Sequence, residues 1–431
     1  MKRILTIVSL TLLTLTAGAQ TTPALEQLKA NPRKAYGTDY PYQQEACPLT
    51  KTPKGYKPFY ISHYGRHGSR YLIHHREYDY PYATLKAADR IGKLSEKGKL
   101  VLEHVRKLRD EAEGRLGELT PLGAEQHQGI ARRMYKRFPE VFKGDASVDA
   151  KSTIVIRCII SMDNALHQLA ALNPRLRITS DASAHDMYYM NLQDRKLFSQ
   201  KWPEQATADY NDYCKRHARH EEPMLRLFND SEYAWQSINL SRLNLSMFKL
   251  ASSVQGTECG KQLSLFADLY TPDELYHNWL QVNAYWYIAF GPSPLNGGLQ
   301  PFTQRNLLKK IIEEADGCIA LPKPGATLRF GHETIVLPLA CLLGLNGFNQ
   351  EVTDLETLEG RGWINYKVFP MAANVQFVFY RKNPSDDDVL VKVLLNENEA
   401  TLPIPSDCAP YYHWRDFRDF YLNKLAEYKE Q

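Results

Sequence analysis

The chain has 431 residues and a formal net charge of +4. So small a charge on so long a chain gives by itself no argument for nucleic-acid binding. The length exceeds one ordinary hydrophobic core and predicts two lobes. We expect a monomeric α/β protein that takes a small molecule as its partner and needs no cofactor and no metal.

The first 19 residues resemble a secretory signal peptide. Lys2 and Arg3 form its charged start, an apolar stretch runs from Ile4 to Leu15, and Ala17-Gly18-Ala19 is a small-residue cleavage site. The apolar stretch is too short for an ordinary membrane span, and no later run is long and apolar enough for one. We expect cleavage after Ala19 and export to a periplasm or the medium, with outer-membrane vesicles as one form of export.

A motif of two arginines around one histidine follows the first predicted strand. Phe59 to Tyr64 is rich in aromatic and β-branched residues, which favours a strand, and Arg66-His67-Gly68-Ser69-Arg70 comes next. Each guanidinium can bind two phosphate oxygens, and a neutral imidazole between them would face the phosphorus. The motif therefore suggests phosphoryl transfer through a phosphohistidine. Alone, the same string could be a solvated basic turn.

Further strands and helices alternate along the chain. Such alternation is typical of a layered α/β domain with a mainly parallel central sheet, to which we assign residues 20–186 and 315–431. Strand signals almost vanish between 187 and 314, so we expect an inserted helical lobe there, with the active site in the cleft between the lobes. The further strand-like runs are Thr153–Ile156, Leu176–Thr179, Ala326–Phe330 and Val375–Tyr380.

The inserted segment contains a dense basic cluster. Lys215, Arg216 and Arg219 lie close together with two histidines between and beyond them, and such a rim would suit a highly phosphorylated substrate. The alternative is a plain exposed helix face. Arg132-Arg133 and Lys136-Arg137 further upstream are interpreted as a solvated face of one helix.

A second histidine stands where the strand at 326–330 gives way to an apolar helical pattern. His332 is followed by Glu333, which can supply a proton to a leaving alkoxide. Thr334 is a candidate cap for a helix whose N-terminal amides would attract anions. Both histidine motifs fit the carboxyl ends of strands, where ligands collect in open α/β sheets. Taken alone, His332 could be a buried histidine at a helix start.

Together these motifs resemble the histidine acid phosphatases of the phosphoglycerate-mutase-like clan. The early R-H-G-x-R paired with a distant H-[DE] is the signature of that family, and Leu119–His127 resembles its L-T-x-x-G-x-x-Q segment. Three later blocks are similar to the multiple inositol polyphosphate phosphatase and phytase branch, namely 373–381, 392–397 and 411–414.

The resemblance implies roles for individual residues. His67 matches the nucleophile, Arg66 and Arg70 match phosphate-binding arginines, His332 matches the second imidazole on the phosphate, and Glu333 matches the proton donor. Most phytases of the clan have Asp at the last position, and Glu is similar to the inositol polyphosphate branch.

One position departs from the family pattern. A third phosphate arginine is expected six residues after an I-R-S strand end, but Ile156-Arg157-Cys158 is followed there by Asp163. We assign phosphate binding to Arg157 instead. The alternative is that Arg157 forms an ion pair with Asp163 or another local acid.

The resemblance implies a phosphomonoesterase that hydrolyses inositol hexakisphosphate and lower inositol polyphosphates without a metal. A broad-specificity exported acid phosphatase is the alternative, and an inactive phospholigand-binding protein is a less favoured one. Which ring phosphate leaves first stays open, as does the pH optimum.

Seven cysteines occur in the sequence. An oxidising compartment permits disulfides, and the odd count leaves at least one thiol unpaired. Cys158 and Cys341 lie in apolar patterns and are expected to be buried thiols, whereas Cys214 with Cys259, or Cys47 with Cys408, are candidate pairs. None of the spacings resembles a zinc site.

Overall fold

A computed structural model describes residues 23–42, 48–192, 194–261 and 269–428. A single mixed sheet with the order β3-β2-β4-β1-β5-β6-β7 forms its centre, and β8 pairs with β6. The strands are β1 (Lys57–Arg66), β2 (Ser147–Ser152), β3 (Arg177–Asp181), β4 (Gly325–Gly331), β5 (Asn374–Arg381), β6 (Leu390–Leu395), β7 (Asn398–Glu399) and β8 (Tyr412–His413).

Most of the longer strands run in one direction. β1 pairs in parallel with β4, and β2 pairs in parallel with both β3 and β4. β5 is antiparallel to β1, and β6 is antiparallel to β5, so β6 again runs with β1. The predicted α/β class with a mainly parallel sheet is confirmed.

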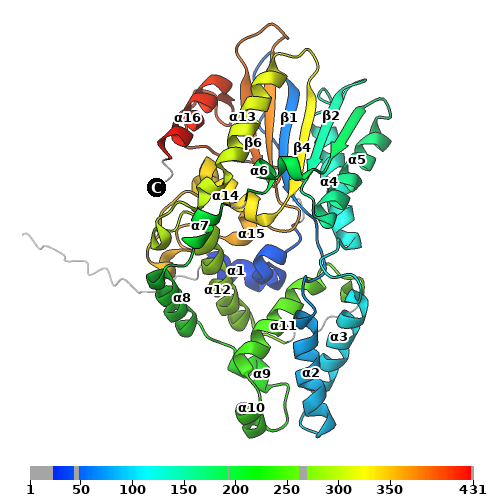
Figure 1. Ribbon diagram of the computed structural model, residues 1–431, viewed down its shortest axis with the longest axis vertical. Helices are drawn as coiled ribbons and strands as arrows, with labels where there is room; N and C mark the ends of the chain where they lie inside the picture. Colours follow the sequence, from blue (N-terminus) through cyan, green and yellow to red (C-terminus); the bar gives the residue numbers. More distant parts are fainter. Residues whose placement is uncertain (1–22, 43–47, 193, 262–268, 429–431) are drawn as a thin grey trace, which may run out of the picture.

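Helices cover both faces of this sheet (Figure 1). α4 and α5 pack against each other on the face where Ile61 and Leu328 are buried, and α13 and α14 contact β1 on the opposite face, with Tyr60 and Tyr64. Burial on both faces explains why β1 is almost continuously apolar or aromatic.

Several further helices form a body beside the sheet (Figure 1). The described residues between 187 and 304 contain no strand, as the sequence suggests, but α2 and α3 come from outside that range and α2 packs against α11. The division of the chain at 187 and 314 stays a prediction. The helices are α1 (Pro23–Ala30), α2 (Arg76–Arg90), α3 (Glu96–Ala112), α4 (Pro121–Arg137), α5 (Ile156–Leu172), α6 (Met187–Met190), α7 (Arg195–Ser199), α8 (Glu204–Arg216), α9 (Glu221–Leu225), α10 (Ser231–Ser237), α11 (Leu240–Val254), α12 (Pro272–Phe290), α13 (Arg305–Ile319), α14 (Glu333–Leu343), α15 (Asn365–Val368) and α16 (Trp414–Glu427).

One predicted strand is displaced. The β-branched run at 153–156 is not a strand, because β2 ends at Ser152 and α5 begins at Ile156. The side chains of Ile154 and Ile156 are exposed, so the β-branched character of this run does not reflect burial in the sheet. The bounds of the other predicted strands lie within two residues of those of β1, β3, β4 and β5.

The cysteines of the described residues carry free thiols. Cys158 and Cys341 are buried, as expected, but Cys214 and Cys259 are free thiols, so the candidate disulfide between them is absent, and the pair of Cys47 with Cys408 involves a residue that is not described. Cys47 and the first 22 residues, with the predicted signal peptide, lie outside the described residues. Among the helices that are described, none combines the length and apolar character that crossing a membrane requires.

Candidate active site

Three parallel strands end together and bring the two histidine motifs to one edge of the sheet. The backbone N–H of His67 donates to the carbonyl of Gly331 at 2.8 Å, and the N–H of Thr153 donates to the carbonyl of Phe330 at 3.0 Å. The ends of β1, β4 and β2 are therefore fixed to one another just where their side chains leave the sheet.

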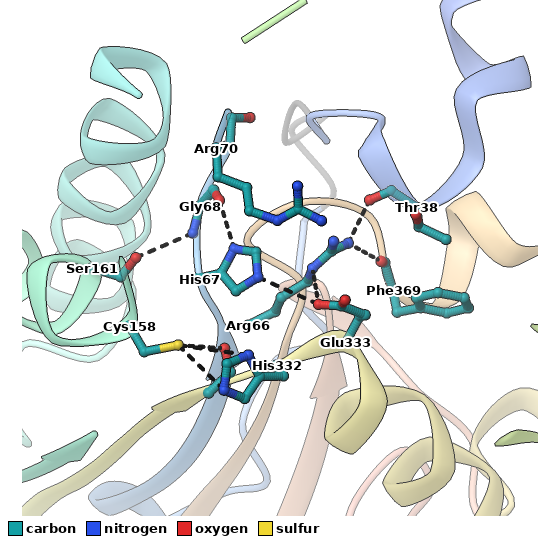
Figure 2. Close-up of polar contacts among 12 residues, drawn as sticks. Thr38, Arg66, His67, Gly68, Arg70, Cys158, Ser161, His332, Glu333 and Phe369 are labelled. Atoms are coloured by element: carbon teal, nitrogen blue, oxygen red, sulfur yellow. Dashed lines mark hydrogen bonds and ion pairs between the residues drawn. The ribbon is translucent and has the colours of Figure 1, made fainter. Parts of the chain in front are cut away.

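The two imidazoles face each other across this edge. The ring centroids of His67 and His332 lie 5.8 Å apart and their planes are nearly perpendicular. Glu333 Oε2 lies 3.4 Å from His67 Nε2 and 3.1 Å from Arg66 Nε. Figure 2 shows these four side chains together, with the Arg70 guanidinium directed toward the same space. The predicted His67, His332, Glu333, Arg66 and Arg70 thus form one cluster.

The hydrogen bond of His67 fixes which ring nitrogen can react. Nδ1 lies 2.8 Å from the carbonyl oxygen of Gly68, and because a carbonyl can only accept, Nδ1 carries the proton. Burial lowers the pKa of His67 well below its ordinary value. The neutral ring therefore presents the lone pair of Nε2 to the centre of the cluster.

Burial also keeps His332 neutral. It lowers the pKa of this imidazole to about 4. His332 Nε2 lies 3.2 Å from Thr153 Oγ1, and the ring touches the thiol of Cys158. His332 is itself the N-cap of α14, without a side-chain capping bond, so the expectation that Thr334 caps this helix is wrong.

Glu333 is held as a carboxylate. Burial would raise its pKa, but the positive charges of Arg66 and Arg70 outweigh burial, and the pKa lies well below the ordinary value. In this state the group accepts protons and cannot donate one, so its use as an acid requires that the surrounding positive charge first be offset.

Arg66 is anchored on one side and open on the other. Its side chain is fully buried, and Nη1 donates to the carbonyls of Thr38 and of Phe369. Its Nε lies 3.1 Å from Glu333 Oε2, but among the described residues its Nη2 has no hydrogen-bond acceptor, nor do the Nε atoms of Arg70 and Arg157. Buried guanidinium donors without acceptors point to an anionic ligand.

The sequence suggested that Arg157 lies at a strand end, but Arg157 reaches the cluster from the first turn of α5. Its charge acts on the pKa of both His67 and His332. The alternative ion pair with Asp163 is absent, because Asp163 is half-exposed and pairs with His167 instead.

The residues of the predicted substrate rim pair with neighbours of their own, and their role at the substrate stays a prediction. Lys215 pairs with Asp212, Arg216 pairs with Glu356, and Arg219 donates to nearby carbonyls. α8, which carries the first two, packs on α12 at the edge of the helical body (Figure 1). Among the described residues, no contact joins this rim to the His67 cluster, so the contacts favour an ordinary exposed helix end.

Several residues of the site carry no recognisable sequence signal. The carbonyls of Thr38 and Phe369 hold Arg66 from positions far away in the chain. Asp39 is buried beside Arg66 and Arg70, which help to lower its pKa against the effect of burial, and Ser252 of α11 donates to it at 3.0 Å.

The cluster is better suited to an anion than to a cation. The donor atoms of His67, His332 and Glu333 lie within 4.8 Å of one another and could in principle hold a metal ion. Three guanidinium groups surround them, however, and their positive charge would repel a cation and attract a phosphate.

Comparisons with known proteins agree with this geometry. Residues 65–396 match the family model for the histidine phosphatase superfamily (branch 2). Multiple inositol polyphosphate phosphatase 1 of Dictyostelium discoideum is 26% identical over 110 residues, which span 25% of this chain and 17% of that protein.

Solved structures share the fold. The multiple inositol polyphosphate phosphatase of Bifidobacterium longum, in complex with inositol hexasulfate, superposes with a TM-score of 0.73 and 19% identity, covering 89% of this chain and 96% of the other. The phytase from D. castellii superposes with a TM-score of 0.70 and 14% identity, covering 93% and 86% of the two chains.

Proposed function

The chain belongs to the histidine phosphatase superfamily, branch 2, and from this premise we propose that it hydrolyses phosphate monoesters of inositol through a phosphohistidine on His67. One observation carries the proposal. The neutral ring of His67 directs an unprotonated Nε2 into a group of buried guanidinium donors that have no hydrogen-bond acceptor within the described residues.

In the proposed first step, the guanidinium groups of Arg66, Arg70 and Arg157 and the ring of His332 bind the phosphoryl oxygens. They also offset the charge that develops in the transition state. His67 Nε2 forms a bond to phosphorus while the bond from phosphorus to the inositol oxygen breaks, and that oxygen takes a proton from Glu333.

The low pKa of Glu333 in the free protein is compatible with this step. A phosphate dianion placed among the arginines offsets the charges that lower the pKa, so the carboxylate can take up a proton when substrate binds. A substrate that binds as the monoanion brings the same proton with it.

In the second step, water attacks the phosphohistidine. The Glu333 carboxylate, having given up its proton, accepts one from the water as the oxygen bonds to phosphorus, and the phosphorus–nitrogen bond breaks. Inorganic phosphate leaves, and His67 returns with the proton still on Nδ1.

The substrate class rests on the similarity to inositol polyphosphate phosphatases and phytases. A time course of inositol phosphates released from inositol hexakisphosphate, resolved by isomer, tests both reaction and substrate. We expect lower inositol phosphates from the wild type and none from His67→Ala, with the fold of the variant intact. Undiminished release by His67→Ala would refute the assignment.

A comparison of kcat/KM between inositol hexakisphosphate and a simple aryl phosphate separates the remaining alternatives. A clear preference for the inositol substrate supports the proposal, and equal values favour a broad-specificity acid phosphatase. Binding without release of phosphate from either compound would indicate an inactive phospholigand-binding protein.

The proposal includes export as a monomer. It is supported by the charged start, the apolar stretch and the small-residue cleavage site of residues 1–19. Sequencing the N-terminus of protein recovered from outside the cytoplasm should give Gln20 as the first residue, and light scattering should give the mass of one chain.

A further inference from the structure

A second group of potential metal ligands lies at the beginning of α16. Asp407, Cys408 and His413 each offer one ligand atom, and these three atoms lie within 4.8 Å of one another. The group belongs to the segment that leads through β8 into α16, and Asp388, just before β6, adjoins it. None of the four residues has a role in the function proposed above.

Asp388 fixes the orientation of the His413 ring. Its Oδ1 lies 2.9 Å from His413 Nδ1, and its other oxygen accepts a hydrogen bond from the hydroxyl of Tyr56. Lys382 lies 3.6 Å from the same carboxylate. A carboxylate held in this way favours the tautomer with the proton on Nδ1, which is the arrangement that orients metal-binding histidines.

The opposite ring nitrogen faces a second carboxylate. His413 Nε2 lies 3.3 Å from Asp407 Oδ1. With the proton on Nδ1, a neutral ring places its lone pair beside an anionic oxygen, and a positive charge between the two atoms would favour this contact. A proton on Nε2 or a metal ion would satisfy this contact.

The thiol of Cys408 favours the metal. A proton shared between His413 and Asp407 needs no third group, but Cys408 Sγ lies in the same cluster. Sulfur, imidazole nitrogen and carboxylate oxygen together are a donor set that Zn²⁺ takes in proteins, with water in the fourth position.

The surroundings would attract a divalent cation. A cavity of about 450 Å³ opens beside His413, and its lining contains the carboxylates of Asp387, Asp388 and Asp416 together with one cation, Arg415. Arg415 is largely exposed and directed toward Asp416. Negative charge therefore predominates around the three ligand atoms.

We propose that Asp407, Cys408 and His413 bind a zinc-type divalent ion, with Asp388 orienting His413. This site is independent of the His67 cluster. Binding converts the Cys408 thiol into a thiolate and releases its proton to the buffer. The ion would connect the segment 407–413 to the chain before β6.

Cobalt titration of the full chain tests the proposal, because a thiolate–Co²⁺ bond gives a charge-transfer band in the near ultraviolet. We expect one equivalent of Co²⁺ to produce the band and Zn²⁺ to displace it. Cys408→Ser should abolish the band, and Cys214→Ser, which changes another half-buried thiol, should leave it intact.

Two further variants test whether the band comes from Cys408 and whether Asp388 orients His413. Cys158 lies next to His332, so the active site could itself bind Co²⁺ through sulfur, and the band must therefore persist in Cys158→Ser. Asp388→Asn should weaken Zn²⁺ binding by about 10–100-fold, the effect expected for a carboxylate that orients a ligand.

Two results of the cobalt titration would rule the proposed metal site out. If Co²⁺ gives no thiolate band with the wild type, or if the band survives in Cys408→Ser, the site does not exist as proposed. Hydrolysis of inositol phosphates need not be measured, so failure of this test leaves the proposed function untouched.

Discussion

At the residue scale, Glu333 must be protonated in one step of the proposed catalytic cycle and deprotonated in the other. Its pKa in the free protein is low because the positive charges of Arg66 and Arg70 outweigh the effect of burial. The cycle proposed here needs its protonated form only after an anion has entered. Its contribution should therefore depend on how strongly the leaving group requires a proton.

Replacement of Glu333 by Gln tests this dependence. An inositol alkoxide is a poor leaving group, whereas a nitrophenolate leaves without protonation. Glu333→Gln should lower the rate of phosphorylation of His67 by inositol hexakisphosphate about 10²–10⁴-fold, the usual range for a positioned acid. Single-turnover measurements should show a much smaller loss with the nitrophenyl ester, and equal losses would contradict the role.

Arg157 is the second residue whose role can be isolated. Its unpartnered Nε is buried and its charge acts on both histidines, whereas Asp163, six positions later, is half-exposed. If Arg157 contacts the transferred phosphate, Arg157→Gln should lower kcat about 10²–10³-fold, as removal of one transition-state donor does elsewhere.

Asp163→Asn is the matched control on the same helix. It should change kcat less than twofold, since surface substitutions of this kind are close to neutral. Equal effects of the two substitutions, or no effect of Arg157→Gln, would show that Arg157 is a structural residue.

At the scale of elements, the turn after β1 rests directly on the start of α4. A Cβ added to Gly68 would lie 2.4 Å from the carbonyl oxygen of Gly123, and a Cβ on Gly123 would lie 2.3 Å from the carbonyl oxygen of Ser69. The N–H of Ser69 donates to Gln126 of α4, and that of Gly68 donates to Ser161 of α5. These helices hold the carbonyl that fixes the His67 tautomer.

Gly123→Ala should therefore affect catalysis more than folding. The methyl group must push the turn away from α4, which moves the Gly68 carbonyl and the ring bonded to it. A misplacement of about 1 Å can reduce turnover about 10²-fold. Gly129→Ala on the same helix meets only the guanidinium of Arg133 and no backbone atom, and serves as the control. Normal kcat for Gly123→Ala would contradict this account of the turn.

Local sequence signals predicted the ends of β1 and β4 well, because an apolar strand followed by glycine and charged residues is a strong pattern. They failed at β2, where Ser147–Ser152 alternates small and polar residues while the β-branched run after it is more conspicuous. The sequence did suggest that Arg133 and Arg137 form a solvated face, yet both contact the buried Glu397.

The groups that hold Arg66 and Arg70 in place could not be predicted from the sequence, for a different reason. The Thr38 carbonyl lies 28 positions before Arg66, and that of Phe369 lies 303 positions after it. Backbone carbonyls leave no trace in residue type. Asp39 is one aspartate among many until the fold places it beside Arg66 and Arg70. Such contacts depend on the assembled chain.

At the scale of the whole molecule, buried neutral histidines link stability to pH. Burial lowers the pKa of His63 to about 3 and the pKa of His127 and of His332 to about 4. It also lowers the pKa of His67 well below its ordinary value. In the unfolded chain each would titrate near 6.5. Between these values the unfolded chain binds protons that the folded chain does not, so acidification favours unfolding.

The free energy of unfolding should therefore fall as the pH drops from 7 to 5. Each of these histidines should lower the free energy of unfolding by about 2 kcal/mol between pH 7 and pH 5. Urea unfolding in the absence of phosphate measures it, and His63→Gln should reduce the pH dependence by about one proton. Stability that stays constant between pH 7 and 5 would mean that the imidazoles are protonated in the folded protein.

The proposed mechanism depends on His67 Nε2 forming a bond to phosphorus. Rapid alkaline quenching during turnover, followed by mass spectrometry and comparison with the two phosphohistidine isomers, tests it directly. We predict phosphate on His67 alone, in the Nε2 isomer, because Nδ1 is bound to the Gly68 carbonyl. Phosphate on Nδ1, on another residue, or on no residue while turnover continues would contradict the mechanism.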